Sequence, residues 1–115
     1  MCNCSRKVEN RGAPVLVRIW ETRFDLARKT ELIAYANDVS LPVLRSRSGC
    51  EGVLFFSLDT CWVTQTIWDK RSSIDALATD PEYARIVEGI LALDIHRSDQ
   101  TTRVFEMAGG SAHGR

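Results

Sequence analysis

The residues best suited to metal or redox chemistry in this 115-residue chain are its cysteines and histidines: Cys2, Cys4, Cys50, Cys61, His96 and His113. Cys2 and Cys4 have one residue between them, whereas paired zinc ligands are usually separated by about two to four residues. Neither Cys50 nor Cys61 has a histidine at ligand spacing. Four cysteines are too few for a disulfide scaffold, and a reducing compartment keeps such residues as thiols. We therefore expect free thiols and no metal, with a metal or redox role as the alternative.

Other catalytic signatures are absent from the sequence, and the composition excludes two classes of partner. There is no glycine-rich phosphate loop, no meaningful Ser/His/Asp order and no persuasive pair of carboxylates. Fifteen basic residues balance fifteen acidic ones, so no global basic surface for nucleic acid is expected. No apolar run approaches the roughly 20 residues of a membrane span, and the polar start lacks a signal peptide. These features predict a cytoplasmic protein that binds neither nucleic acid nor membranes.

The chain is long enough for one domain. We expect a polar, flexible leader over 1–13, a single folded domain over 14–107 and a glycine-rich, disordered tail over 108–115. The ordered part would bury one modest core.

The first half of this domain changes from strand to helix periodicity. Residues 15–23 are rich in β formers and predict a strand. Asp25 is the expected N-cap of the helix that follows. Its expected buried face consists of four residues at helical spacing, Leu32, Ala36, Val39 and Val43, flanked by Leu26, Ile33, Ser40 and Leu44. Pro42 should kink or end the helix, and Gly49 should terminate the segment.

A hairpin with its turn at Asp59 and Thr60 is expected next, between strands 51–58 and 60–68. On the second of these strands, alternation places four residues on one face: Trp62, Thr64, Thr66 and Trp68. We assign Leu54, Phe56 and Leu58 to the same face, and Val53 and Phe55 to the opposite face with Val63 and Ile67.

The remaining elements are two helices and a strand. A short helix over 73–78 should be capped by Ser72 or Ser73, and Asp80 should cap a helix over 81–91. His96 is expected in a loop before a strand over 101–107. The order β-α-β-β-α-β predicts an α+β, ferredoxin-like fold: a four-stranded antiparallel sheet with helices on one face.

Such a sheet leaves one face bare, and both faces here carry large apolar residues. An exposed patch of that size is expected to mark an interface. We therefore predict a homodimer that packs sheet against sheet, which zero net charge permits without mutual repulsion.

Five segments resemble the antibiotic biosynthesis monooxygenase superfamily, which consists of dimeric α+β barrels: Val17-Arg-Ile-Trp20, Leu41-Pro-Val-Leu44, Gly49-Cys-Glu-Gly52, Thr66-Ile-Trp-Asp69 and Asp80-Pro-Glu-Tyr83. The resemblance covers about residues 15–107. Haem-degrading relatives pair the Trp at the end of the third strand with an Asn on the first strand and a His on the last helix. Here Val87 occupies the helix position and the first strand has no Asn, so haem degradation of that type is not expected.

The resemblance implies a cofactor-independent, quinone-forming monooxygenase acting on an aromatic, quinol-like molecule. Such chemistry needs an aromatic-lined slot, a group that holds the phenol, and exclusion of water. The candidate catalytic residues are Trp68 as a wall, Arg18 as a cation beside a phenolate, and Tyr83 as a hydroxyl. The candidate ligand-binding residues are Trp62, Trp20 and Phe56.

Alternatives stay open at this point. Arg18 could instead pair with Glu21 or Glu106, and Arg18 and Trp20 could face the dimer partner. The protein could also be a non-enzymatic dimeric barrel that binds a small apolar ligand or a partner protein, or a haem binder through Cys or Tyr. A ligand-sized cavity beside Trp68 would favour the oxygenase, and a filled space would count against it.

Overall fold

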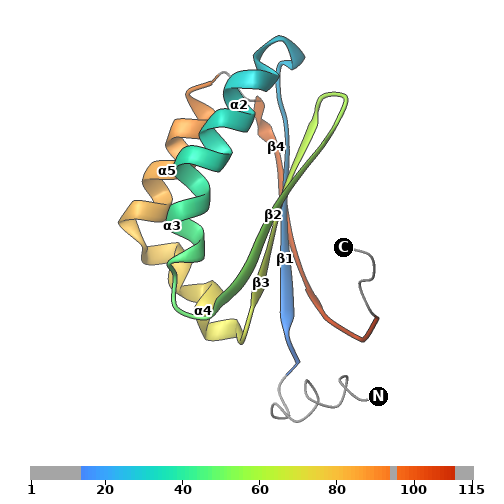
Figure 1. Cartoon of the computed structure of the whole chain (residues 1–115), viewed down its shortest axis with the longest axis vertical. Coiled ribbons are helices and arrows are strands. Elements are labelled where there is room, and N and C mark those ends of the chain that lie inside the picture. Colours follow the sequence, from blue (N-terminus) through green and yellow to red (C-terminus); the bar gives the residue numbers. More distant parts are fainter. Residues whose placement is uncertain (1–13, 94–95, 111–115) are drawn as a thin grey trace.

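A computed structural model describes residues 14–93 and 96–110 of the chain, with side chains of β4 described from Gln100 onward. The predicted leader, Cys2, Cys4 and His113 lie outside these residues. The strands are β1 (Leu16–Arg23), β2 (Cys50–Leu58), β3 (Cys61–Trp68) and β4 (His96–Glu106). The helices are α2 (Lys29–Tyr35), α3 (Leu41–Arg45), α4 (Arg71–Asp75) and α5 (Pro81–Leu91). Figure 1 shows the helices as one layer on one side of the sheet.

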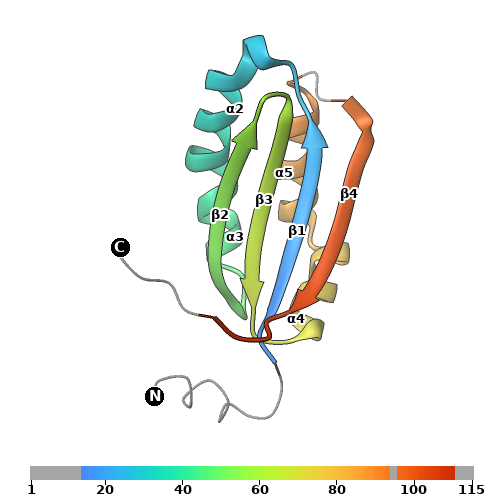
Figure 2. The ribbon, with the colours of Figure 1, turned by 90° about the vertical axis from the view of Figure 1, so that its right-hand side faces the viewer.

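The strands form a single antiparallel sheet in the order β2-β3-β1-β4. Figure 2 shows this sheet with its helix-free face toward the viewer and the helices behind. This is the predicted α+β, ferredoxin-like arrangement. Because β1 and β3 are the central strands, residues of their helix-facing side occupy the middle of the molecule.

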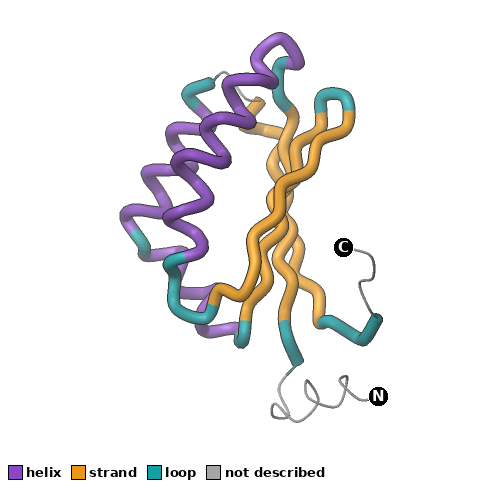
Figure 3. The backbone as a smooth tube through the Cα atoms, in the orientation of Figure 1, coloured by secondary structure: helices purple, strands orange, loops and turns teal. Residues whose placement is uncertain are grey.

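The first helical region runs from α2 through a π-helical turn, Ala36–Ser40, into α3, and it is continuous in Figure 3. Asp25 is an N-cap as predicted: it caps the 3₁₀ helix Leu26–Arg28, which leads into α2, by accepting a hydrogen bond from the backbone of Ala27 (3.0 Å). α2 itself has no side-chain cap. Pro42 does not end the helix. A proline cannot donate a backbone hydrogen bond, and the preceding wide turn accommodates it near the start of α3.

The π turn also shifts the buried stripe. The buried positions are Leu32, Ala36, Ser40 and Leu44, whereas Val39 is 39% exposed. The predicted face through Val39 and Val43 was therefore wrong, since a wide turn adds a residue between successive inward positions. One consequence is that a serine, Ser40, lies in the interior.

The hairpin of β2 and β3 corrects the predicted faces. Asp59, with φ of 52°, and Thr60 form a two-residue turn, so Leu58 pairs with Cys61 and Phe56 with Val63. Directly paired residues share a face. Phe56 therefore lies on the helix-free face with Val63, and Phe55 lies on the helix-facing side of β3 with Thr64. The predicted pairing of Phe56 with Trp62 and Trp68 on one face was wrong.

Two other boundaries differ from expectation. The short helix begins at Arg71 and has no side-chain cap; Ser73 donates instead to Asp69 (2.7 Å). His96 lies in β4 rather than in a loop, because β4 begins five residues earlier than predicted. Asp80 caps α5 as expected, accepting from the backbones of Glu82 and Tyr83.

Two apolar clusters form the core between sheet and helices. One contains Trp20, Phe24, Leu32, Ala36, Trp62 and Ile90. The other contains Leu16, Trp68, Ile74 and Leu77. Each cluster holds one of the two tryptophans of β3. No helix within the described residues has the length and apolar character needed to cross a membrane.

Candidate functional site

The centre of the helix-facing side of the sheet is polar, between the two apolar clusters. Register places Arg18 of β1 opposite Thr66 of β3, and Trp20 opposite Thr64. Trp62 and Trp68 flank the two threonines along β3, and all four side chains are buried. The strand alternation in the sequence therefore places a threonine pair between two indoles.

A small cavity of about 20 Å³ lies between these strands and the helices. Its polar lining residues are Arg18, Ser40, Thr64, Thr66 and Tyr83, and its apolar lining residues are Trp20, Leu44, Ile86, Val87 and Ile90. This volume accommodates about one water-sized group. A whole aromatic ring does not fit in this conformation, so the predicted ligand-sized space beside Trp68 is not found there.

Arg18 and Tyr83, two of the candidate residues, both line this cavity. The guanidinium carbon of Arg18 lies 5.7 Å from the centre of the Tyr83 ring, which is cation–π distance. Both side chains are half-buried. Glu21 is not the partner of Arg18, because it lies on the helix-free face and pairs with Arg103 (3.0 Å). Arg18 and Trp20 lie on the helix-facing side of the sheet and not on its helix-free face.

Trp68 does not line the cavity directly. It is fully buried, and its indole nitrogen donates to the hydroxyl of Thr66 (2.7 Å). Trp62 makes the matching bond to Thr64 (3.1 Å). The two indoles therefore do not line the cavity themselves. Each one is hydrogen-bonded to a threonine that does.

Ser40 approaches the same cavity from the helix layer. It is 2% exposed, and its hydroxyl has no hydrogen-bond partner among the described residues. A buried hydroxyl without a partner costs free energy, about 1–3 kcal/mol. A water molecule or a ligand atom bound in the cavity would supply the hydrogen bond that the Ser40 hydroxyl lacks.

Helix α5 is held against the first helical region at close range. The Tyr35 hydroxyl donates to the carbonyl of Ile86 (3.1 Å), and a methyl group at Gly89 would overlap that hydroxyl. Burial raises the pKa of Tyr35 above its usual value. At the other end of α5, Arg47 forms ion pairs with Asp80 (2.9 Å) and with Glu82. These contacts fix the helix that carries Tyr83.

Phe56 and Trp62 do not line the central cavity, and they lie on opposite faces of the sheet. Both line an open groove of about 330 Å³ between the edge strand β2 and the first helical region, with Ile33, Asn37 and Leu41 on the helical side. Trp62 is stacked there on Phe55, at 5.7 Å between ring centres. The six predicted site residues therefore divide: three line the central cavity, two line the edge groove, and Trp68 contacts the cavity through Thr66.

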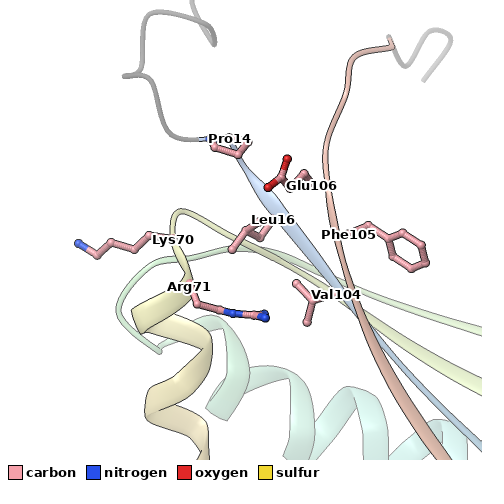
Figure 4. A pocket seen from close by; sticks show the side chains of 7 residues that line it. All are labelled: Pro14, Leu16, Lys70, Arg71, Val104, Phe105 and Glu106. Atoms are coloured by element: carbon pink, nitrogen blue, oxygen red, sulfur yellow. The ribbon is translucent and has the colours of Figure 1, made fainter.

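A third hollow, an open groove of about 360 Å³, lies where β1 and β4 meet the start of α4. Figure 4 shows Arg71 directed toward Val104, while the side chains of Lys70 and Phe105 extend away from the other labelled residues. No residue predicted for the site lines it.

The thiols at Cys50 and Cys61 are free, and burial raises the pKa of each. Glu21 adds to the effect at Cys61, whose Sγ lies 3.7 Å from its carboxylate. Raised pKa values reduce thiolate and hence reactivity. Within the described residues no group of three or more His, Cys, Asp or Glu side chains is placed to hold a metal ion.

The sequence prediction missed Ser40, Thr64 and Thr66 as cavity residues. A signal existed for the threonines, since two polar residues between two tryptophans on one strand face interrupt an otherwise apolar surface. Ser40 had no such signal, because its inward position depends on the π turn.

The fold and the cavity define a class: small ferredoxin-like α+β proteins with a site between the sheet and the helices. The chain shares this fold with antibiotic biosynthesis monooxygenase structures. A monooxygenase of Streptomyces coelicolor in complex with the ligand nanaomycin D matches with a TM-score of 0.71 at 15% identity, over 94% of this chain and 99% of that one.

Two further structures have the same fold. A structure from Deinococcus radiodurans, described as that of a "putative antibiotic biosynthesis monooxygenase", gives a TM-score of 0.68 at 13% identity, over 87% of this chain and 98% of that one. A protein of unknown function from Nitrosomonas europaea gives 0.68 at 11% identity, over 89% and 97%. No family model and no curated protein sequence matches the chain. The likeness is therefore one of fold.

Proposed function

We propose that this protein is a cofactor-independent monooxygenase of the antibiotic biosynthesis type that oxidises an aromatic, quinol-like small molecule. The observation that carries the proposal is the convergence of Arg18, Tyr83 and two threonine hydroxyls on one cavity between sheet and helices. The related fold of a monooxygenase in complex with nanaomycin D supports it.

In this reaction the protein has to position the substrate and stabilise the negative charge of its anion. A ring methylene or its phenol tautomer, written RH₂, reacts with O₂ to give R=O and H₂O. The substrate supplies all four electrons, and one oxygen atom enters the product while the other leaves as water. Arg18 would stabilise the substrate anion, because a fixed cation at a largely dry site favours negative charge. Tyr83 would bind a second substrate oxygen.

A substrate can enter the cavity only if the side chains at its entrance move; we call this entrance, formed by Arg18 and Tyr83, the rim. The cavity of about 20 Å³ admits an oxygen-sized group but not a ring. Arg18 and Tyr83 are the half-buried polar side chains of its lining. In the proposed complex Tyr83 moves outward, and the aromatic ring of the substrate takes its place beside Arg18.

We also propose that the functional unit is a homodimer with the helix-free sheet faces packed together. This face exposes large apolar side chains, with Leu54 and Phe56 each 48% and Phe105 46% exposed. A cytoplasmic location fits this reading.

The test is oxygen uptake with a panel of hydroquinones and phenolic polyketides. The wild type should consume oxygen with at least one of them, while Arg18→Met should lower kcat/KM by about 100-fold, the typical loss when one group that stabilises developing charge is removed. Arg85→Met, an exposed arginine on α5, is the matched control. No uptake across the panel would refute the proposal.

A second candidate is a non-enzymatic dimeric barrel that binds a small molecule or a partner protein. The small volume of the cavity favours it. Ligand binding without oxygen consumption would establish this alternative.

A further inference from the structure

The two Trp–Thr pairs of β3 determine what kind of atom the cavity can hold. An indole nitrogen can only donate a hydrogen bond, and a hydroxyl has one proton and two lone pairs. Since Thr66 accepts from Trp68 (2.7 Å) and Thr64 accepts from Trp62 (3.1 Å), each threonine keeps its own proton to donate. Both hydroxyls therefore favour an acceptor beside them.

The rest of the lining has the same polarity. Arg18 contributes a cation, and no carboxylate of the described residues lines the cavity. Ser40, from the helix layer, contributes a buried hydroxyl that has no partner among the described residues. The donors come from both layers and surround a volume of about 20 Å³, which fits one oxygen atom with its bonding partners outside.

We propose that this cavity binds a single anionic oxygen of the substrate, a phenolate or enolate oxygen, through the hydroxyls of Thr66, Thr64 and Ser40. Trp68 and Trp62 are positioning residues: each indole fixes its threonine as a donor and does not contact the substrate. This inference rests on the proposed function and deepens it. It accounts for the small volume, because only the oxygen enters the cavity while the ring lies at the rim formed by Arg18 and Tyr83.

The experiment measures the ionisation of a bound phenol. The ligand is 4-nitrophenol, whose anion absorbs visible light and which ionises near neutral pH. Bound to the wild type, its pKa should be lower than in free solution, because donors and a cation stabilise the anion. Absorbance titrations at several protein concentrations give the affinity of each protonation state.

Thr66→Val should raise the pKa of the bound phenol by about one unit, which is about tenfold weaker binding of the anion with little change for the neutral form. Thr66→Ser keeps a hydroxyl and should restore the wild-type value. Thr101→Val, at an exposed position of β4, is the matched control and should have no effect.

The role of Trp68 is tested by Trp68→Phe, which keeps a ring in the core and removes the indole donor. It should raise the bound pKa by less than Thr66→Val does. The double variant should equal Thr66→Val alone, because an indole that acts through Thr66 has no effect once the hydroxyl is gone. Should Thr66→Val fail to fold, Ser40→Ala from the opposite layer supplies the same measurement, with about threefold weaker anion binding expected.

The outcomes separate the two proposals. If the wild type binds 4-nitrophenol but none of these variants changes its pKa, a water fills the cavity and the inference is overturned while the proposed function stands. If the wild type does not bind the phenol, or binds it without lowering its pKa, the inference is overturned, whereas oxygen uptake with the substrate panel decides the proposed function separately. An additive effect of Trp68→Phe and Thr66→Val would overturn the positioning role of Trp68.

Discussion

The two faces of β3 both carry apolar residues but have opposite surroundings. On the helix-facing side, Trp62 and Trp68 are 2% and 0% exposed, and each indole has a hydrogen-bond partner. On the helix-free side, Val63 and Ile67 belong to a surface that also includes Phe56, Leu58 and Phe105. The first face holds a polar centre between two apolar clusters. The second face is largely apolar, but it also carries Gln65 and the ion pair of Glu21 with Arg103. Specific chemistry needs the former, and association needs only the latter.

The largest expected effect on stability is on the helix-facing side of β3, called the covered face from here on; the helix-free face is called the bare face. Trp68→Ala should lower the free energy of unfolding by about 3–5 kcal/mol, because it removes a fully buried indole from a packed cluster. Phe105→Ala on the bare face, 46% exposed, should cost less than about 1 kcal/mol in a protomer. Urea unfolding of both variants measures the difference. Equal costs would show that the two faces are equally covered.

The bare face is tested next by Phe56→Asp. If this face packs against a second copy, a charge there should weaken dimerisation by about 2–3 kcal/mol and yield monomers in sedimentation experiments at micromolar concentration. The control is Leu26→Asp, which introduces the same charge at a similarly exposed position outside the sheet (50% against 48%). A wild type that sediments as a monomer would contradict the dimer.

Gly89→Ala sharpens the comparison through the helix layer. The added methyl group would overlap the hydroxyl of Tyr35, so we expect a loss of about 1–3 kcal/mol in unfolding free energy. Tyr35→Phe in the same chain should recover part of that loss. Gly52→Ala on the bare face is the counterpart, where the new methyl would lie 3.1 Å from the flexible end of Ile67. If Gly52→Ala lowered the free energy of unfolding as much as Gly89→Ala does, the helix layer would not be the more tightly packed of the two regions.

Ser40→Ala tests the polar centre of the covered face. If the cavity is empty in the free protein, removal of the unpartnered hydroxyl should raise the free energy of unfolding by about 1 kcal/mol. A loss of stability would instead show that a bound water already bonds Ser40. Thermal or chemical unfolding distinguishes the two signs.

The smallest effect concerns the two described thiols. Burial raises the pKa of both Cys50 and Cys61, so both hold less thiolate at neutral pH and should react slowly with iodoacetamide. Cys61 lies on the bare face and Cys50 beside Trp68. Alkylation of Cys61, followed by peptide mass spectrometry, should accelerate severalfold in Phe56→Asp, with Cys50 unchanged. Equal rates at Cys61 in both proteins would argue against a covered face.

Much of the fold follows from local patterns. The strands, the caps at Asp25 and Asp80, and the tight turn after Leu58 all rest on short-range preferences, and the element order then leaves few topologies. The prediction failed where one residue of register matters. Phe56 was assigned to the wrong face because a two-residue turn pairs even-numbered with odd-numbered positions. Val39 was expected inside because the π turn before Pro42 was not foreseen.

The candidate site was predicted in part for the same reason. Arg18, Trp20 and Tyr83 were named as candidates and all line the cavity. Strand alternation put Arg18 and Trp20 on one face together, but it left open which side of the sheet that face is. Phe56 and Trp62 do not join them there. Ser40 could not be found, because its inward position depends on the helix geometry around it.

The sequence by itself determined the class of fold, the apolar character of both sheet faces, and the Trp-x-Thr-x-Thr-x-Trp order of β3. These follow from side-chain alternation and propensity, which act over a few residues. Only the tertiary structure decided that the indoles bond the threonines, that Ser40 faces them, and that the enclosed space has the size of one oxygen atom. Those properties arise because two layers approach each other at distances fixed by contacts such as that of Tyr35 with Ile86, and no local pattern encodes such distances.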